Sequence, residues 1–185
     1  IAAFLPGEEG GHGIADVLTG AVDASGRLPV SMLHHAGQIP LHSGRKWDAG
    51  SAMGNFEADY IDGAAEPLYS FGHGLSYTQF RCTDAEVRTG TTADTCPLEV
   101  ECTLHNVGTR DGVEVLRLEI QDLVASVTRP VCQLAGFARI ELAAGASVRI
   151  RFRLDRSQLG LYDRQMQFVV EPGELRYRIV GGAVE

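Results

Sequence analysis

The chain has 185 residues, 44% of them hydrophobic, and a formal net charge of −8 at pH 7. That apolar fraction is enough for a packed core and argues against wholesale disorder. The acidic balance argues against nucleic acid or an anionic membrane surface as partners, since both attract Lys- and Arg-rich patches, and no apolar run approaches the roughly 20 residues that span a bilayer.

Residues 1–20 predict a strand, a turn and a helix. Residues 1–5 are a continuous apolar run, typical of a buried parallel strand, and Pro6-Gly7 ends it. Apolar residues then recur at helical spacing, and Gly20 is a stop signal. A short strand over residues 27–32 completes a strand–helix–strand pattern, typical of an α/β layer. Because the chain opens in mid-strand without an initiating Met, we expect it to be the C-terminal portion of a longer protein.

Residues 33–67 form a predicted long loop, because they show no sustained period and are rich in glycine and histidine. Loops of this length in compact domains are usually functional or disordered. The only tryptophan of the chain, Trp47, lies inside it, with His42 and Arg45 close by in sequence.

From about residue 80 the apolar period becomes 2, which predicts strands. The alternation is clear over residues 98–104, 116–120, 140–142, 148–154, 168–170 and 177–179. Short strands separated by polar turns predict an antiparallel, immunoglobulin-like β-sandwich, and no helical period is visible in this part. We therefore predict two units, an incomplete α/β part over residues 1–78 and an all-β sandwich over residues 79–185.

No metal site and no cofactor site is predicted. The four cysteines include no C-x-x-C pair, and the histidines have no ligand spacing. Cys102 alternates with apolar neighbours and is interpreted as a core residue, while the disulfide pairing and the redox compartment stay open. The glycines at the start of the chain lack the Gly-Lys-Ser/Thr of a phosphate-binding loop. The alternating Arg149, Arg151 and Arg153 are interpreted as a solvated strand face, and Asp111 as a turn residue.

Several stretches together resemble glycoside hydrolase family 3. PGEEGGHGIADVLTG, ASGRLPVSM, GQIP and PLYSFGHGLSYTQF resemble the end of the second domain of that family. HNVGTRDGVEVLRLEIQD, SVTRPVCQLAGFARIEL and EPGELRYRIVGG resemble the fibronectin type III-like domain that follows in many members. The resemblance implies a retaining β-glycosidase that hydrolyses β-glucosides or β-xylosides. The partners that it implies are an oligosaccharide or an aryl or alkyl β-glycoside as substrate, and an N-terminal TIM-barrel-like domain.

No catalytic residue is carried onto this chain by the resemblance. The nucleophilic aspartate of the family lies in the barrel domain, and its acid/base lies upstream of the PG-x-EGG segment. We therefore expect this chain alone to be inactive. Glu9 matches the glutamate of that segment and is interpreted as an acid at the start of a helix, where the helix dipole favours it; the alternative is a supporting role near the interface with the barrel.

His42, Arg45 and Trp47 are the candidates for contact with sugar at the active-site mouth. Aromatic faces stack on pyranose rings, and Arg or His can hydrogen-bond hydroxyls. A homodimer contact and local packing are the alternatives for this loop. The rival from another class is a freestanding carbohydrate-binding or structural β-sandwich module. The choice between glucoside and xyloside, the linkage, the oligomeric state and a cytoplasmic or secreted location stay open.

Overall fold

A computed structural model describes residues 1–46, 66–89 and 98–181. Trp47, Cys96 and most of the predicted loop lie outside these residues. Among the described residues, no helix is long and apolar enough to cross a membrane.

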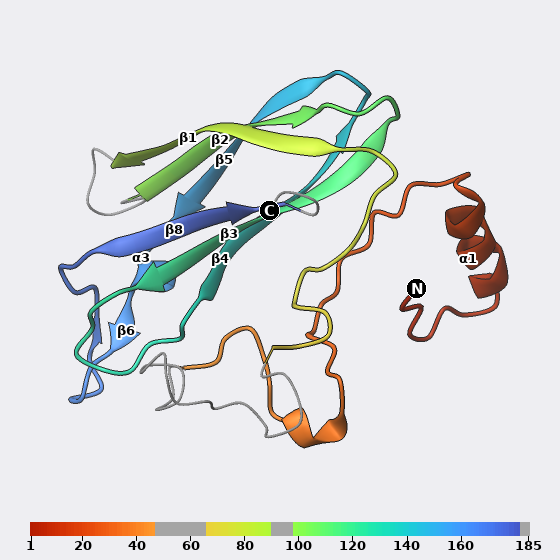
Figure 1. The fold of residues 1–185 in the computed structure, drawn as a ribbon. Coiled ribbons are helices and arrows are strands. Elements are labelled where there is room, and N and C mark those ends of the chain that lie inside the picture. Colours follow the sequence, from red (N-terminus) through yellow and green to blue (C-terminus); the bar gives the residue numbers. More distant parts are fainter. Residues whose placement is uncertain (47–65, 90–97, 182–185) are drawn as a thin grey trace.

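The second half of the chain is a two-layer antiparallel β-sandwich (Figure 1). One sheet has the order β1-β2-β5, with β1 Phe80–Thr89, β2 Leu98–Asn106 and β5 Ser147–Leu154. The other has the order β4-β3-β8, with β4 Gln133–Leu142, β3 Gly112–Asp122 and β8 Leu175–Val180. The predicted all-β sandwich is confirmed, because inward apolar residues of the two sheets meet in one core.

That core is built from the alternation that the sequence displays. Every second residue is buried from Val100 to Asn106 in β2 and from Gly112 to Ile120 in β3, as period 2 requires, and Cys102 is among them with no exposed surface. The cluster consists of Phe80, Val100, Cys102, Leu104, Leu116, Leu118, Ile120, Ala135, Phe152 and Leu154. Cys82, Cys102 and Cys132 are free thiols.

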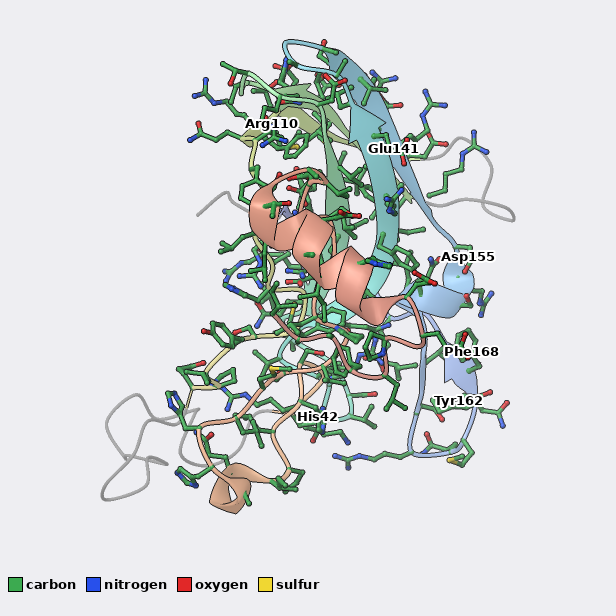
Figure 2. All side chains as sticks on the ribbon, turned by 90° about the vertical axis from the view of Figure 1, so that its right-hand side faces the viewer. His42, Arg110, Glu141, Asp155, Tyr162 and Phe168 are labelled. Atoms are coloured by element: carbon green, nitrogen blue, oxygen red, sulfur yellow. The ribbon has the colours of Figure 1, made fainter. Side chains whose placement is uncertain are left out.

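Two short elements close one end of the sandwich. A four-residue helix, α3 (Arg156–Leu159), follows β5 and is capped by the side chain of Asp155; a single turn is too short to give a helical period in the sequence. A small hairpin of β6 (Leu161–Tyr162) and β7 (Phe168–Val169) comes next. Figure 2 shows the rings of Tyr162 and Phe168 together on this hairpin, where they meet edge to face at 64°. Rings at that angle do not form the flat platform on which a sugar stacks.

The first half of the chain holds one substantial helix, α1 (Gly10–Thr19), beside the sandwich (Figure 1). Gly20 ends it in the left-handed conformation, with φ of 76°, as the stop signal predicts. A 3-10 turn, η1 (Ala36–Gln38), lies further along.

Two predicted strands are absent from this half. Residues 1–5 are irregular, and Leu5 is 98% exposed. Residues 27–32 contribute only one isolated bridge, between Met32 and Tyr69. An apolar run forms a buried parallel strand only between neighbouring strands, and the described residues provide none beside residues 1–5.

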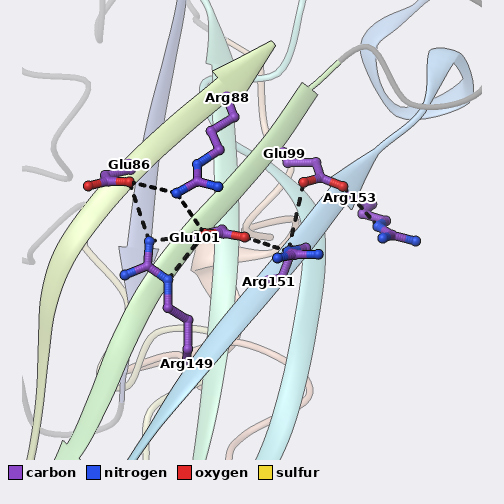
Figure 3. Close-up of polar contacts among 7 residues, drawn as sticks. All are labelled: Glu86, Arg88, Glu99, Glu101, Arg149, Arg151 and Arg153. Carbon is purple, nitrogen blue, oxygen red and sulfur yellow. Dashed lines mark hydrogen bonds and ion pairs between the residues drawn. The ribbon is translucent and has the colours of Figure 1, made fainter. Parts of the chain in front are cut away.

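The outer face of the β1-β2-β5 sheet carries a cluster of ion pairs rather than independent solvated charges (Figure 3). Glu101 on β2 is only 2% exposed, because Arg149 and Arg151 of β5 lie over it. Hydrogen bonds from Arg149 and then Arg151 hold the pKa of the Glu101 carboxyl below its usual range, although burial acts in the opposite direction. Arg153 pairs instead with Glu99 at 2.9 Å.

Candidate functional site

The two halves of the chain meet along the free edge of β3. β8 pairs with β3 only from Arg117 to Asp122, so the first residues of β3 need other partners for their backbone groups. The Asp23 carboxylate accepts the N–H of Val113 at 3.3 Å and that of Tyr77 at 2.7 Å. Burial alone would raise the pKa of Asp23, but these bonds and one from Ser76 hold it below its usual range. Asp23 thus joins three segments that are far apart in sequence.

A buried ion pair lies next to this carboxylate. The Arg27 guanidinium donates to the Glu114 carboxylate at 3.2 Å, and their side chains are 5% and 0% exposed. Arg27 also donates to three backbone carbonyls, of Ala24, Gly26 and Leu75. One carboxylate oxygen of Glu114 accepts the N–H of Val115 as well, whereas the other has no hydrogen-bond partner. Breaking such a pair leaves an uncompensated buried charge, so it fixes one half against the other.

A cavity of about 510 Å³ separates the predicted loop from the β4-β3-β8 sheet. Its size is within the range of ligand pockets. The loop side contributes His42, Arg45, Glu66 and Phe71, and the sheet side contributes Arg117, Glu119, Cys132 and Arg178. His42 lies at the end of the molecule opposite Arg110 (Figure 2).

The loop is attached to the sandwich at Arg45 and Lys46. The carbonyl oxygen of Arg45 accepts the N–H of Val131 at 2.8 Å, and Lys46 forms an antiparallel bridge with Pro130. The Arg45 guanidinium lies 3.9 Å from the Glu66 carboxylate, across the mouth of the same loop.

Charged side chains of the sheet form the opposite wall of the cavity. Arg117 lies over the ring of Phe71 at 5.3 Å and 3.4 Å from the Glu119 carboxylate. Arg178 donates to the same carboxylate at 2.6 Å, and the Cys132 thiol donates to it at 3.3 Å. Burial, and then the Glu119 charge, raise the pKa of the Cys132 thiol to about 11. The thiol therefore stays protonated near neutral pH and is not an activated nucleophile.

The structure brings two of the three loop candidates together. His42 and Arg45 both line the cavity, and Trp47 lies outside the described residues. Glu9 does not line it: this residue precedes α1 and makes no side-chain cap, and its carboxylate lies 2.7 Å from the His12 ring on the surface. The interpretation of Glu9 as an acid at the start of a helix agrees with that position.

Sequence reasoning missed the residues of the sheet wall and of the buried pair. Glu114 carried a signal, because an acid occupies an inward position of the alternation between Gly112 and Leu116. Arg117 and Glu119 gave no such signal in the sequence, since charged residues at every second position are typical of a solvated face.

The cavity offers hydrogen-bond donors for hydroxyl or carboxyl groups. The buried carboxylate of the cavity, Glu119, pairs with Arg117 and Arg178 and accepts a hydrogen bond from the Cys132 thiol. Among the described residues, no group of three or more His, Cys, Asp or Glu side chains could hold a metal ion.

Comparisons with known proteins account for both halves of the chain. Residues 1–77 match the glycosyl hydrolase family 3 C-terminal domain, and residues 114–183 match a fibronectin type III-like domain. The chain is 36% identical over 179 residues to the periplasmic beta-glucosidase of Salmonella typhimurium and 33% identical over 178 residues to a putative beta-xylosidase of Formosa agariphila. These matches cover 94% and 96% of this chain but 23% of each relative.

Solved structures give the same result. A β-glucosidase from Erythrobacter marinus superposes with a TM-score of 0.83 at 36% identity, covering 96% of this chain and 23% of that one. The β-glucosidase of Listeria innocua in complex with glucose superposes with a TM-score of 0.83 at 30% identity, covering 96% of this chain and 26% of that one. The superposition includes both halves and the junction between them. The chain belongs to glycoside hydrolase family 3.

Proposed function

We propose that this chain works as the C-terminal part of a retaining β-glycosidase that hydrolyses β-glucosides or β-xylosides. The observation that carries the proposal is the superposition of 96% of the chain on β-glucosidase structures. The chain spans about a quarter of the length of these relatives, so the proposed activity belongs to a longer polypeptide. The substrates in this proposal are oligosaccharides and aryl or alkyl β-glycosides.

Hydrolysis with retention needs two carboxyl groups about 5–5.5 Å apart, one as nucleophile and one as acid/base. Glu119 is the buried carboxylate of the cavity, and its oxygens face Arg117, Arg178 and Cys132. A carboxylate with these partners is not free to attack or to protonate a glycoside. The proposal therefore places the catalytic pair in the barrel domain and its adjoining segments, and this chain supplies scaffold.

His42, Arg45 and Trp47 are proposed to shape the mouth of the active site. The position of His42 and Arg45 on the cavity wall supports this role, because both can donate to sugar hydroxyls. The division into residues 1–78 and 79–185 is proposed as well, and the start of β1 at Phe80 supports it.

The test compares this chain with the full-length polypeptide on p-nitrophenyl β-D-glucopyranoside and β-D-xylopyranoside. We expect turnover by the full-length protein, none by this chain, and no retention of this chain on cellulose or xylan. Turnover by neither protein, together with retention of this chain on a polysaccharide, would favour the freestanding binding module. In the full-length protein, Trp47→Ala with unchanged kinetics, specificity and oligomeric state would exclude the mouth role of that residue.

A further inference from the structure

The predicted loop is closed at its base by its own backbone. Met32 and Tyr69 exchange both hydrogen bonds, at 2.8 and 3.1 Å, so the chain leaves and returns at one point. The buried Gln38 side chain adds a second internal link, because it accepts the N–H of His34 and donates to the carbonyl of Glu66. These contacts close the loop, but they do not fix it relative to the rest of the molecule.

Among the described residues, two contacts join the loop and its base to the sandwich. At one, the Pro130–Val131 backbone pairs with Arg45 and Lys46 as a short piece of antiparallel sheet. Proline is tolerated at position 130, because the hydrogen bond to the carbonyl of Arg45 is donated by the N–H of Val131 and not by residue 130.

At the other contact, Arg117 on β3 packs against the base of the loop, at Phe71 and Gly72 just beyond the Met32–Tyr69 bridge. Its guanidinium stacks over Phe71 at 5.3 Å, and a Cβ added to Gly72 would lie 0.9 Å from one of its nitrogens. A nitrogen of the guanidinium therefore occupies the space that a side chain at position 72 would fill. Arg117 donates no hydrogen bond to another described residue, and its Nε is buried without an acceptor. The ion pair with Glu119 at 3.4 Å, the stacking on Phe71 and the packing against Gly72 together account for its position.

We infer that Val131 and Arg117 are positioning residues, through which the fibronectin-like unit holds the loop that carries His42 and Arg45. The inference rests on the proposed function for its kinetic consequence, but the attachment itself is a property of this chain. One contact lies within the loop, at Arg45 and Lys46, and the other lies at its base, at Phe71 and Gly72 just beyond the Met32–Tyr69 bridge. Loss of the first releases the backbone of Arg45 and Lys46 from the sandwich, and loss of the second releases the base of the loop next to the Met32–Tyr69 bridge.

The chain contains a reporter for this attachment. Trp47 is its only tryptophan and follows Lys46 directly, so acrylamide quenching of its fluorescence measures how firmly the adjoining residues are held. Val131→Pro removes the N–H that Arg45 accepts, and Arg117→Met removes the stacked guanidinium. Arg139→Met is the matched control, because Arg139 also pairs with a glutamate two residues later on its own strand, Glu141, but does not line the cavity.

Loss of one hydrogen bond shifts the equilibrium between held and released loop by about fivefold. We expect the quenching constant of Trp47 to rise in Val131→Pro and in Arg117→Met, and to stay at the wild-type value in Arg139→Met. Circular dichroism must show that each variant keeps a folded sandwich. If Val131→Pro does not fold, the quenching constants of Arg117→Met and of the conservative variant Arg117→Lys test the inference. Unchanged quenching in the folded variants would overturn the inference.

In the full-length protein, the same variants should raise KM for a β-linked disaccharide about fivefold and change kcat little. A loss of stability alone would lower the amount of active enzyme and leave KM unchanged. Raised quenching with unchanged KM would contradict the positioning role. A wild-type protein without glycosidase activity would refute the proposed function, while the quenching data would still decide the attachment.

Discussion

Replacing Arg27 with methionine should destabilise the chain by about 3–5 kcal/mol, the cost of removing one partner from a buried ion pair. The reason is the complete burial of Glu114, whose side chain is 0% exposed. At the observed separation of 3.2 Å, Coulomb's law with an effective dielectric constant of about 20 gives an attraction of roughly 5 kcal/mol. Desolvation of the two charges costs about as much, so the intact pair is close to neutral, but the carboxylate alone is not.

The Glu114→Gln variant should cost less, about 1–3 kcal/mol. The amide keeps the shape of the carboxylate and can still accept from Arg27 and from the N–H of Val115, and Arg27 keeps its three carbonyl acceptors. In the double variant no buried charge is left without its partner. We therefore expect the sum of the two single losses in the free energy of unfolding to exceed the loss in the double variant by about 1–3 kcal/mol.

Urea unfolding followed by circular dichroism measures these differences. With an m-value of about 2 kcal/mol/M, the Arg27→Met midpoint should fall by about 1.5–2.5 M. Arg139→Met is the control, because that arginine is half exposed and its pair with Glu141 contributes little. A loss of less than about 1 kcal/mol for Arg27→Met, or additive single effects, would refute the reasoning, since the desolvation of an unpaired buried carboxylate could then not govern this site.

Three further variants test other contacts. Glu101→Gln should reduce the loss of folding stability at acid pH. The folded pKa of Glu101 is depressed, so its stabilising contribution is present above the unfolded pKa of about 4.3 and is lost as the pH falls through the folded pKa. Urea titrations between pH 6 and pH 3 measure this loss, and the same pH dependence in variant and wild type would contradict the prediction. Gly72→Ala should cost on the order of 2 kcal/mol, because φ is +77° and the Cβ would clash with Arg117; thermal unfolding in the Arg117→Met background should show about half that cost, and equal costs would exclude the clash. Asn106→Ala should cost on the order of 3 kcal/mol, because its buried amide bonds Thr78, Gly108 and the carbonyls of Arg110 and Leu142; a midpoint within error of the wild type in urea would contradict this.

The sandwich was predictable where alternation is unbroken. β2 and β5 follow the expected ranges closely, since period 2 is a local property of the sequence. β1 and most of β4 were not predicted. In β1 the register shifts between Thr83 and Glu86, and in the β3–β4 pairing it shifts at Leu118 and Glu119. A β-bulge inserts a residue into the pattern, so the apolar positions no longer alternate.

Contacts between distant segments could not be predicted from local pattern. Alternation places Glu101 on the outer face of its strand, but it does not show that arginines 48 and 50 positions later would cover it. Arg27 and Glu114 are 87 positions apart. The cavity next to His42 and Arg45 depends on how the loop lies against β3, which no periodicity describes. The predicted strand over residues 1–5 was wrong for the same reason, because a buried strand depends on neighbouring strands that the local sequence does not specify.

The stretches through which the sequence resembles its family acquire a physical meaning at the junction. ASGRLPVSM contains Arg27, HGLSYTQF contains the Ser76 and Tyr77 that bond Asp23, and HNVGTRDGVEVL contains Asn106 and Glu114. SVTRPVC contains the Pro130–Val131 segment that pairs with the loop. In this part of the molecule the motifs therefore specify how one unit is joined to the other. The stretches that assign the chain to its family are thus the same stretches that build this joint.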